Sequence, residues 1–299
     1  MIVKAVDDKS TPEYPHPFLS PSWLNFCGAS YTIFQTGTSV SALSRFSMRG
    51  IHVLATPPWA LDCGLSCQIS TEEYIALTSN WSARSETLKI IDLPPLPENS
   101  SLTKASIKVN TPRSFKIQWK HTRQILLDTP LPNNRRKQVK RAEREGITCH
   151  LSKDWSNVLS LHHESRIRKE IHSDSFQLNT LLNSVSTMKS SFAVEAVDAD
   201  GKCIAAGGFV IVNEDTCLYS FGGQSRSKIS GIASVAMLSF AMEEARSHGV
   251  TTFDFGGSAD PGVDRFYKEF GAARVARARL IYASWWLRPF LRFIRPDLG

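Results

Sequence analysis

The stretch of sequence that decides the fold contains Cys217-Leu-Tyr-Ser-Phe221, then Gly222-Gly223, and then Lys228-Ile-Ser-Gly-Ile-Ala233. The first run is apolar and typical of a strand, and the glycines after it predict a turn. An apolar helix is expected over residues 229–248. The unpaired N–H groups and the positive dipole end of a helix start suit a phosphate. The stretch therefore predicts a strand, a glycine turn and an anion-binding helix start.

The glycine spacing excludes two common nucleotide-binding motifs. No G-x-G-x-x-G follows the strand, and the segment lacks the Gly-Lys-Ser/Thr end of a P-loop. Gly231 and Ala233 are small enough to let phosphates approach the backbone closely. The alternative explanation for both residues is close packing of the helix against the strand.

The neighbouring segments extend this pattern in both directions. Downstream lie Thr251-Thr-Phe-Asp-Phe255, a pair of glycines, and a helix expected near residues 263–270. Upstream, residues 192–197, 203–212 and 217–221 predict an antiparallel meander. A meander, a crossover helix, a strand, a helix and a final strand predict an α/β or α+β fold with a mixed sheet.

The order of these motifs resembles that of the GNAT acyltransferases. Their pyrophosphate-binding turn usually reads Arg or Gln, two residues, Gly, one residue, then Gly or Ala, and Lys228 takes the first place here. Phe253-Asp-Phe-Gly-Gly257 and Arg265-Phe-Tyr-Lys-Glu-Phe-Gly271 look more like the Fem-type branch, which attaches amino acids to peptidoglycan precursors. The basic helix ending in Ala142-Glu-Arg-Glu-Gly146 is similar to that branch too. The matches cover residues 115–281.

The resemblance implies tandem GNAT-like modules, the first of them degenerate. Residues 1–114 would form this degenerate α/β domain, and residues 115–299 an acyltransferase domain with an amphipathic C-terminal tail. The resemblance also implies acyl-CoA or acetyl-CoA as the donor, without a metal. The residues expected to contact the donor are Lys228, Ile229, Ser230, Gly231, Ile232, Ala233 and Lys268.

Tyr267 matches the family position at which a phenol protonates the departing CoA thiolate, a role that general-acid chemistry requires. The alternative for Tyr267 is a core aromatic beside Phe270. Fem-type enzymes more often carry Lys at that position, and here Lys268 follows one residue later. Glu195 and Asp254, on expected strands, are the candidates for the general base.

The helix expected over residues 154–171, with the residue after it, carries further titratable side chains. They are His162, His163, Glu164 and His172. His163 and Glu164 are adjacent and point roughly 100° apart, so they form no metal pair. These residues are expected to lie on the surface.

Three functions fit these motifs. The first is transfer of an acyl group from acyl-CoA to an amine or hydroxyl, on an acceptor that the resemblance suggests is a cell-envelope precursor or a polysaccharide. The second is Fem-type transfer from aminoacyl-tRNA. The third is a GNAT-like module that binds without turnover. We favour acyl-CoA over tRNA because Glu143 and Glu145 interrupt the basic helix and no heptad run occurs.

The composition is that of an ordinary globular protein with an excess of cations. The chain of 299 residues has 42% hydrophobic residues and a net charge of +7, which suits anionic partners. No run approaches the ~20 apolar residues of a membrane span. The N-terminus lacks a signal peptide's basic and apolar regions, so a cytoplasmic location is expected. The six cysteines lack zinc spacing and are expected to be reduced thiols.

The tail Ala283-Ser-Trp-Trp-Leu-Arg-Pro-Phe-Leu-Arg-Phe-Ile-Arg-Pro296 interleaves aromatic residues with arginines. Such a pattern occurs in helices that lie at the surface of an anionic membrane, here the inner face. Pro289 interrupts it, however. We therefore expect a closing helix that packs Trp285, Phe290 and Phe293 onto the domain.

Overall fold

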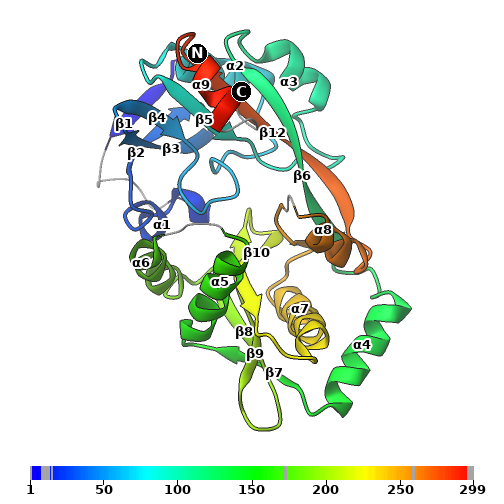
Figure 1. Cartoon of the computed structure of the whole chain (residues 1–299). Coiled ribbons are helices and arrows are strands. Elements are labelled where there is room, and N and C mark those ends of the chain that lie inside the picture. The colour runs from blue at the N-terminus through cyan, green and yellow to red at the C-terminus, as the bar shows by residue number, and fades with distance from the viewer. Residues whose placement is uncertain (1, 8–13, 15, 171–173, 258–259, 295–299) are drawn as a thin grey trace. The chain divides into compact units, whose positions relative to one another are not determined.

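The computed structural model describes residues 2–7, 14, 16–170, 174–257 and 260–294 (Figure 1). Contacts divide the chain into two units. Unit 1 comprises residues 1–121 and 275–299, and unit 2 comprises residues 122–274. The domain boundary expected between residues 114 and 115 lies near the first of these divisions and stays a prediction. Among the described residues, no helix is long and apolar enough to span a membrane.

Unit 1 is built on a mixed sheet with the strand order β1-β2-β3-β4-β5-β12. Its strands are β1 (Lys4–Asp7), β2 (Ser30–Thr36), β3 (Ser39–Met48), β4 (Ile51–Ala55), β5 (Leu88–Asp92) and most of β12 (Ala273–Ala283). All neighbours are antiparallel except β4 and β5. Its helices are η1 (Pro17–Leu19), α1 (Pro21–Leu24), α2 (Thr71–Ala83), α3 (Lys104–Asn110) and α9 (Arg288–Ile294).

Unit 2 has the strand order β6-β11-β10-β9-β8-β7. Its strands are β6 (Lys116–Leu126), which begins in unit 1, β7 (Thr148–Ser152), β8 (Ser191–Val197), β9 (Cys203–Val212), β10 (Thr216–Gln224) and β11 (Thr252–Asp254). Only β10 and β11 are parallel among these neighbours. The helices are α4 (Asn133–Arg144), α5 (Ser156–Arg168), α6 (Ser175–Val185), α7 (Ser230–Ser247) and α8 (Pro261–Lys268).

Both units follow one chain order, which is an antiparallel three-stranded meander, a crossover helix, a parallel strand and a second helix. In unit 1 these elements are β2-β3-β4, α2, β5 and α3, and in unit 2 they are β8-β9-β10, α7, β11 and α8. The strand after each second helix is exchanged. β6 follows α3 but pairs with β11, and β12 follows α8 but pairs with β5. The expected mixed sheet and tandem modules are confirmed.

The two faces of the unit 2 sheet carry different helices. α7 packs on the face that presents Val194, Ala196 and Phe209, within the main apolar cluster of the unit. Glu195 points to the opposite face, because side chains alternate along a strand, and there it meets α5 through Asn157. The helices therefore cover opposite faces of one sheet.

Local features define several element boundaries. Residues 116–126 form the single strand β6. α2 is capped by Ser70, and α4 begins after Pro132 without a side-chain cap. Gly146, with a φ of +76°, does follow the end of α4 as expected.

The tail contradicts its expectation. Trp285, Phe290 and Phe293 are 82%, 60% and 89% exposed, so they do not pack onto unit 1. Ala283, Leu287 and Leu291 of the tail are buried instead. The expected closing helix is present, but the tail packs onto the unit through Leu287 and Leu291.

Candidate active site

The N-terminus of α7 is built by a serine-rich loop that is closed on itself. Ser230 Oγ donates to the Ser225 carbonyl oxygen at 2.7 Å and accepts from the Ser227 N–H at 3.0 Å. Ile229 occupies the N-cap position and offers no side-chain hydrogen bond. No acidic residue lies in the first turn. The helix start is therefore preorganised and uncapped, which suits an incoming anion.

Gly231 is exposed at this helix start. A Cβ atom built on Gly231 would meet no atom within 4 Å, so packing does not require glycine at this position. Lys228 is exposed as well. Both residues lie where an external phosphate could reach them.

The remaining residues of the predicted turn lie deeper. Ile229 is half-buried, and Ser230, Ile232 and Ala233 are 2%, 9% and 0% exposed. Ile232 and Ala233 belong to the apolar cluster under α7. Ala233 therefore agrees with the alternative explanation, in which a small residue allows close packing of the helix against the strand.

The strand before the turn is longer than expected. Gly222 and Gly223 lie inside β10, paired with Gly207 and Ala206 of β9, instead of forming a turn. A Cβ atom on Gly223 would come within 2.2 Å of the Leu161 carbonyl oxygen of α5. This glycine is thus required by the close approach of α5 to the sheet.

β10 extends beyond its parallel neighbour β11 next to the α7 start. β10 pairs with β11 only from Thr216 to Leu218, but it continues along β9 as far as Gln224. A bulge separates Tyr219 from Phe221. As a result, Tyr219 packs on Phe209 and Phe221 packs on His162 of α5. The parallel pair diverges here, and β10 continues beyond β11 toward the α7 start.

Tyr267 is half-buried on α8, and its ring stacks on Phe255 with a centroid distance of 4.9 Å. Burial, followed by the nearby Tyr219 and Asp254, raises the pKa of the Tyr267 phenol above its ordinary value. Burial also raises the pKa of Tyr219. Tyr267 is therefore neutral and protonated at physiological pH. Such a phenol can donate a hydrogen bond, but it releases its proton less readily than an ordinary tyrosine does.

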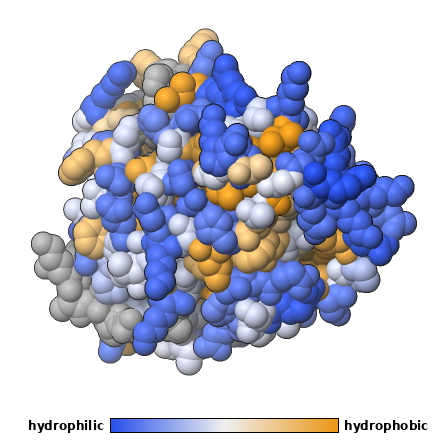
Figure 2. Space-filling view, turned by 90° about the horizontal axis from the view of Figure 1, so that it is seen from below, coloured by the Kyte–Doolittle hydropathy of each residue, from blue (hydrophilic) through white to orange (hydrophobic). Residues whose placement is uncertain are grey.

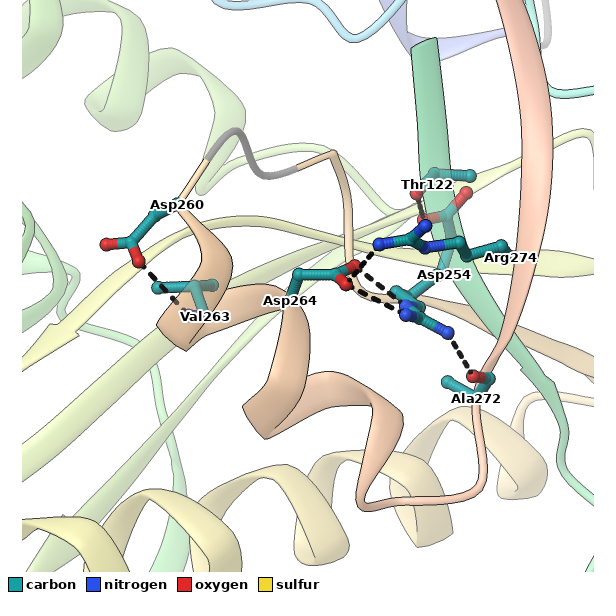
Figure 3. Close-up of polar contacts among 8 residues, drawn as sticks. Thr122, Asp254, Asp260, Val263, Asp264, Ala272 and Arg274 are labelled. Carbon is teal, nitrogen blue, oxygen red and sulfur yellow. Dashed lines mark hydrogen bonds and ion pairs between the residues drawn. The ribbon is translucent and has the colours of Figure 1, made fainter.

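Asp254, at the end of β11, is 1% exposed and strongly hydrogen-bonded (Figure 3). Its carboxylate accepts from the Thr122 hydroxyl, from Gln124 Nε2 at 2.8 Å and from the Gly256 N–H at 2.7 Å. These donors stabilise the charged form and occupy its lone pairs. The geometry favours a positioning role for Asp254 at the end of β11.

Glu195 is 6% exposed on β8 and accepts from Asn157 Nδ2 at 2.8 Å. It does not meet Asp254. The residue of β8 in register with Asp254, through Leu218 and Val210, is Ser191. Strand spacing and rise then separate Glu195 from Asp254 by roughly 20 Å. The two candidate bases do not form one catalytic pair.

Lys268 lines an open basic cavity of about 500 Å³ on the outer side of α8. The lining residues are Arg123, Pro261, Asp264, Arg265, Lys268 and Arg274. Asp264 accepts from Arg123 Nε and Nη2 and from Arg274 Nη2, each at 2.8 Å (Figure 3). Sequence reasoning missed this cluster. The recurrence of charged residues at 264, 265 and 268 along α8 is the signal that could have found it.

His162 departs from its expected surface position. Its Nδ1 accepts from the Gly222 N–H at 3.1 Å, and burial lowers its pKa to about 4. The imidazole is therefore neutral and fixes α5 to the bulged strand. His172 lies outside the described residues.

The basic helix α4 also differs from its expected form. Arg135 is 2% exposed and donates to the Phe266 carbonyl oxygen at 2.6 Å, while its guanidinium lies 4.4 Å from the Phe270 ring centroid. It is thus a packing residue. The exposed cations of α4 are Arg136, Lys137, Lys140, Arg141 and Arg144. In Figure 2 a dense hydrophilic area lies on the side of α4.

No group of three or more His, Cys, Asp or Glu side chains in the described part of the chain is arranged to hold a metal ion. All six cysteines are free.

The chain has a Fem-type, GNAT-like fold. It is similar to FemX, with a TM-score of 0.68, 14% sequence identity, and coverage of 94% of this chain and 96% of that chain. It is also similar to L-PGS from Bacillus licheniformis, with a TM-score of 0.62, 14% identity, and coverage of 97% and 99%.

A third similar structure is the C-terminal domain of a putative lysylphosphatidylglycerol synthetase from Agrobacterium fabrum. It has a TM-score of 0.60 and 9% identity, with coverage of 87% and 86%. No protein-family profile matches the chain, and no curated protein matches its sequence.

Proposed function

We propose that the protein is an acyltransferase that binds the phosphates of an acyl-CoA donor at the start of α7. The observation that carries this proposal is an uncapped helix start with open space at Gly231, next to the part of β10 that extends beyond β11. The helix dipole and the free first-turn N–H groups would hold the pyrophosphate. Lys228 would add a point charge.

The extended edge of β10 would receive the acyl arm of the donor. Backbone groups at the end of a sheet strand can hydrogen-bond an amide-containing chain laid beside them. This arrangement would direct the reactive carbonyl toward the region of Tyr219 and Tyr267, whose phenols are neutral.

Transfer would proceed by attack of an amine or hydroxyl of the acceptor on the acyl carbon. A bond forms from the acceptor to this carbon, the carbon–sulfur bond breaks, and the acceptor proton passes to solvent or to a base. Tyr267 would stabilise the departing thiolate by hydrogen bonding. Because its pKa is raised, this support is electrostatic and involves little proton transfer.

A second donor class is aminoacyl-tRNA, which would make the chain a Fem-type aminoacyltransferase. Two observations favour it, namely the exposed cations of α4 and the basic cavity beside α8. A tRNA backbone would need such an extended cationic surface. Acyl-CoA remains our preferred donor because it explains the α7 start directly.

The test combines calorimetric titration with acetyl-CoA and longer acyl-CoAs with a thiol-release assay over a panel of amines. Binding with turnover supports the proposal. Binding without turnover would indicate a GNAT-like binding module. If the protein neither binds nor turns over any acyl-CoA but binds charged tRNA tightly at physiological salt, the donor is assigned to tRNA.

A further inference from the structure

Four aromatic side chains are exposed together at the C-terminal end of the described chain. Trp285, Trp286, Phe290 and Phe293 are 82%, 45%, 60% and 89% exposed. They fall within the nine-residue span 285–293, which overlaps α9. Burying such rings is strongly favourable, so a concentration of exposed ones indicates an interaction surface.

The leucines of the same segment determine which way these rings point. Leu287 and Leu291 are 4% and 8% exposed and pack against Val53, Leu88 and Ala283. Arg288 Nε donates to the Ala283 carbonyl oxygen at 3.1 Å. The segment is therefore held on the sheet by one side, and its rings are turned outward.

The register of the sheet extends this surface onto the hairpin formed by β3 and β4. Val53 is in register with Leu88, and Leu88 with Ala283, so all three share the face covered by α9. Phe46 is the cross-strand neighbour of Val53, and in the same way Met48 faces Ile51. Phe46 and Met48, 39% and 53% exposed, therefore lie on the α9 face.

The charged residues of the β3–β4 hairpin region and of the C-terminal segment are all basic. No acidic residue occurs in residues 39–61 or in residues 273–296. Arg49, at the turn between β3 and β4, and Arg288 are both exposed. A second copy of the chain docked on this surface would bring like charges together, which is unfavourable. Anionic lipid headgroups would complement the same charges.

We propose that this surface, formed by Trp285, Trp286, Phe290, Phe293, Phe46 and Met48 and called here the aromatic face, docks onto a bilayer that contains anionic lipid. The rings would enter the headgroup region, and Arg49 and Arg288 would contact lipid phosphates. The attachment is peripheral and rests on unit 1 alone. It is independent of the donor chemistry proposed for α7.

The test is co-sedimentation with phosphatidylcholine vesicles that contain or lack phosphatidylglycerol. The wild-type protein should bind the anionic vesicles preferentially. The variant Trp285→Ser/Phe290→Ser/Phe293→Ser should lose binding by about 10-fold or more, because three interfacial rings are removed. The matched control Val109→Ser/Phe176→Ser removes side chains that are 81% and 78% exposed elsewhere, and it should bind like wild type.

A second comparison isolates the charge contribution. Arg49→Gln should weaken binding by about 5-fold, since one cation near an anionic surface contributes about 1 kcal/mol. Arg113→Gln, an exposed arginine between α3 and β6, is its control. Turnover with a water-soluble acceptor should be unchanged in every variant, which separates this proposal from the proposed function.

Three results would overturn the proposal. One is equal sedimentation of the triple variant and wild type, and another is equal binding to vesicles with and without phosphatidylglycerol. The third is a wild-type protein that binds no vesicles and forms a dimer in light scattering, while the triple variant is a monomer. That result would assign the aromatic face to a second copy.

Discussion

The helices α2 and α7 follow the meander in their respective units, yet they begin in opposite ways. At the start of α2, Ser70 Oγ accepts from the Glu73 N–H and the Glu73 carboxylate accepts from the Ser70 N–H, both at 3.2 Å. Glu73 also accepts from the Thr38 N–H at 3.0 Å. At the start of α7 no side chain caps the helix. One helix start is filled by the protein's own carboxylate, and the other is open.

The strands that precede these helices differ in the same sense. β4 stays paired with β5 up to Ala55, and the Thr56 N–H then donates to the Ile90 carbonyl oxygen. β10 runs six residues beyond its last partner on β11. Two units with the same topology therefore differ in how the crossover helix begins and in how far the strand before it extends. A few residues at the crossover decide this difference, which gives the term degenerate a physical meaning for unit 1.

The largest expected effect comes from giving α7 a carboxylate like that of α2. Gly231→Glu should weaken acyl-CoA binding by on the order of 100-fold, because each added like-charge contact costs about 1–4 kcal/mol. Calorimetric titration measures it. The open space at Gly231 should keep the fold intact, which circular dichroism can confirm. Unchanged donor affinity would show that the α7 start has no ligand role.

The next-largest effect is expected from removing the phenol hydroxyl of Tyr267. Tyr267→Phe should lower turnover by about 100-fold, the lower end of the loss caused by removing one hydrogen-bond donor to a developing negative charge, with little change in donor affinity. Tyr282→Phe in unit 1, also half-buried, is the matched control. Because the pKa of Tyr267 is raised, its loss should leave the shape of the pH–rate profile below pH 10 unchanged. Wild-type turnover in Tyr267→Phe would return this residue to a packing role.

Removing the carboxylate from α2 should affect stability alone. Glu73→Gln should destabilise the protein by about 1–2 kcal/mol, the size of a lost helix cap. Burial alone would raise the pKa of Glu73, but hydrogen bonds from Ser70 and Thr38 outweigh it and lower the pKa below 4.5. The stability difference should therefore be complete above pH 4.5 and disappear as the pH falls through the lowered pKa.

Thermal melts of wild type and Glu73→Gln as a function of pH measure this difference. Acyl-CoA affinity should be identical in the two proteins. A drop in affinity would mean that unit 1 contributes to the donor site after all.

The smallest effect concerns Gly231, because packing at the start of α7 does not require a glycine. Gly231→Ala should stabilise the protein by up to about 1 kcal/mol, because alanine loses less entropy in a helix. Donor affinity should fall in the same variant, since a methyl group enters the space for the phosphate. Chemical denaturation and titration measure the two quantities. A gain in stability without any loss of affinity would separate Gly231 from the ligand.

Much of this architecture could be predicted from local sequence patterns. The meander of unit 2, the long helix after it and the glycine at the end of α4 all lie close to their expected positions. Each depends on periodicity and on neighbouring residues, which a single sequence contains. The motif order in unit 2 also indicated the fold before any contact was known.

The contributions of single side chains were harder to predict. Arg135 belongs by sequence to a basic cluster, yet it is buried between α4 and α8. Gly223 looked like a turn residue, yet it lies in a strand that α5 approaches closely. Asp264 gave no signal by itself, because its partners Arg123 and Arg274 come from elements separated in sequence.

The sequence by itself determined the order of strands and helices, the mixed sheet and the glycine-containing helix start, because these depend on the spacing of apolar residues and on local backbone preferences. The tertiary structure alone decided that β6 and β12 are exchanged between units, that Glu195 and Asp254 lie far apart, and that the tail aromatics face outward. Strand partners and exposed faces follow from long-range packing, which no local pattern encodes.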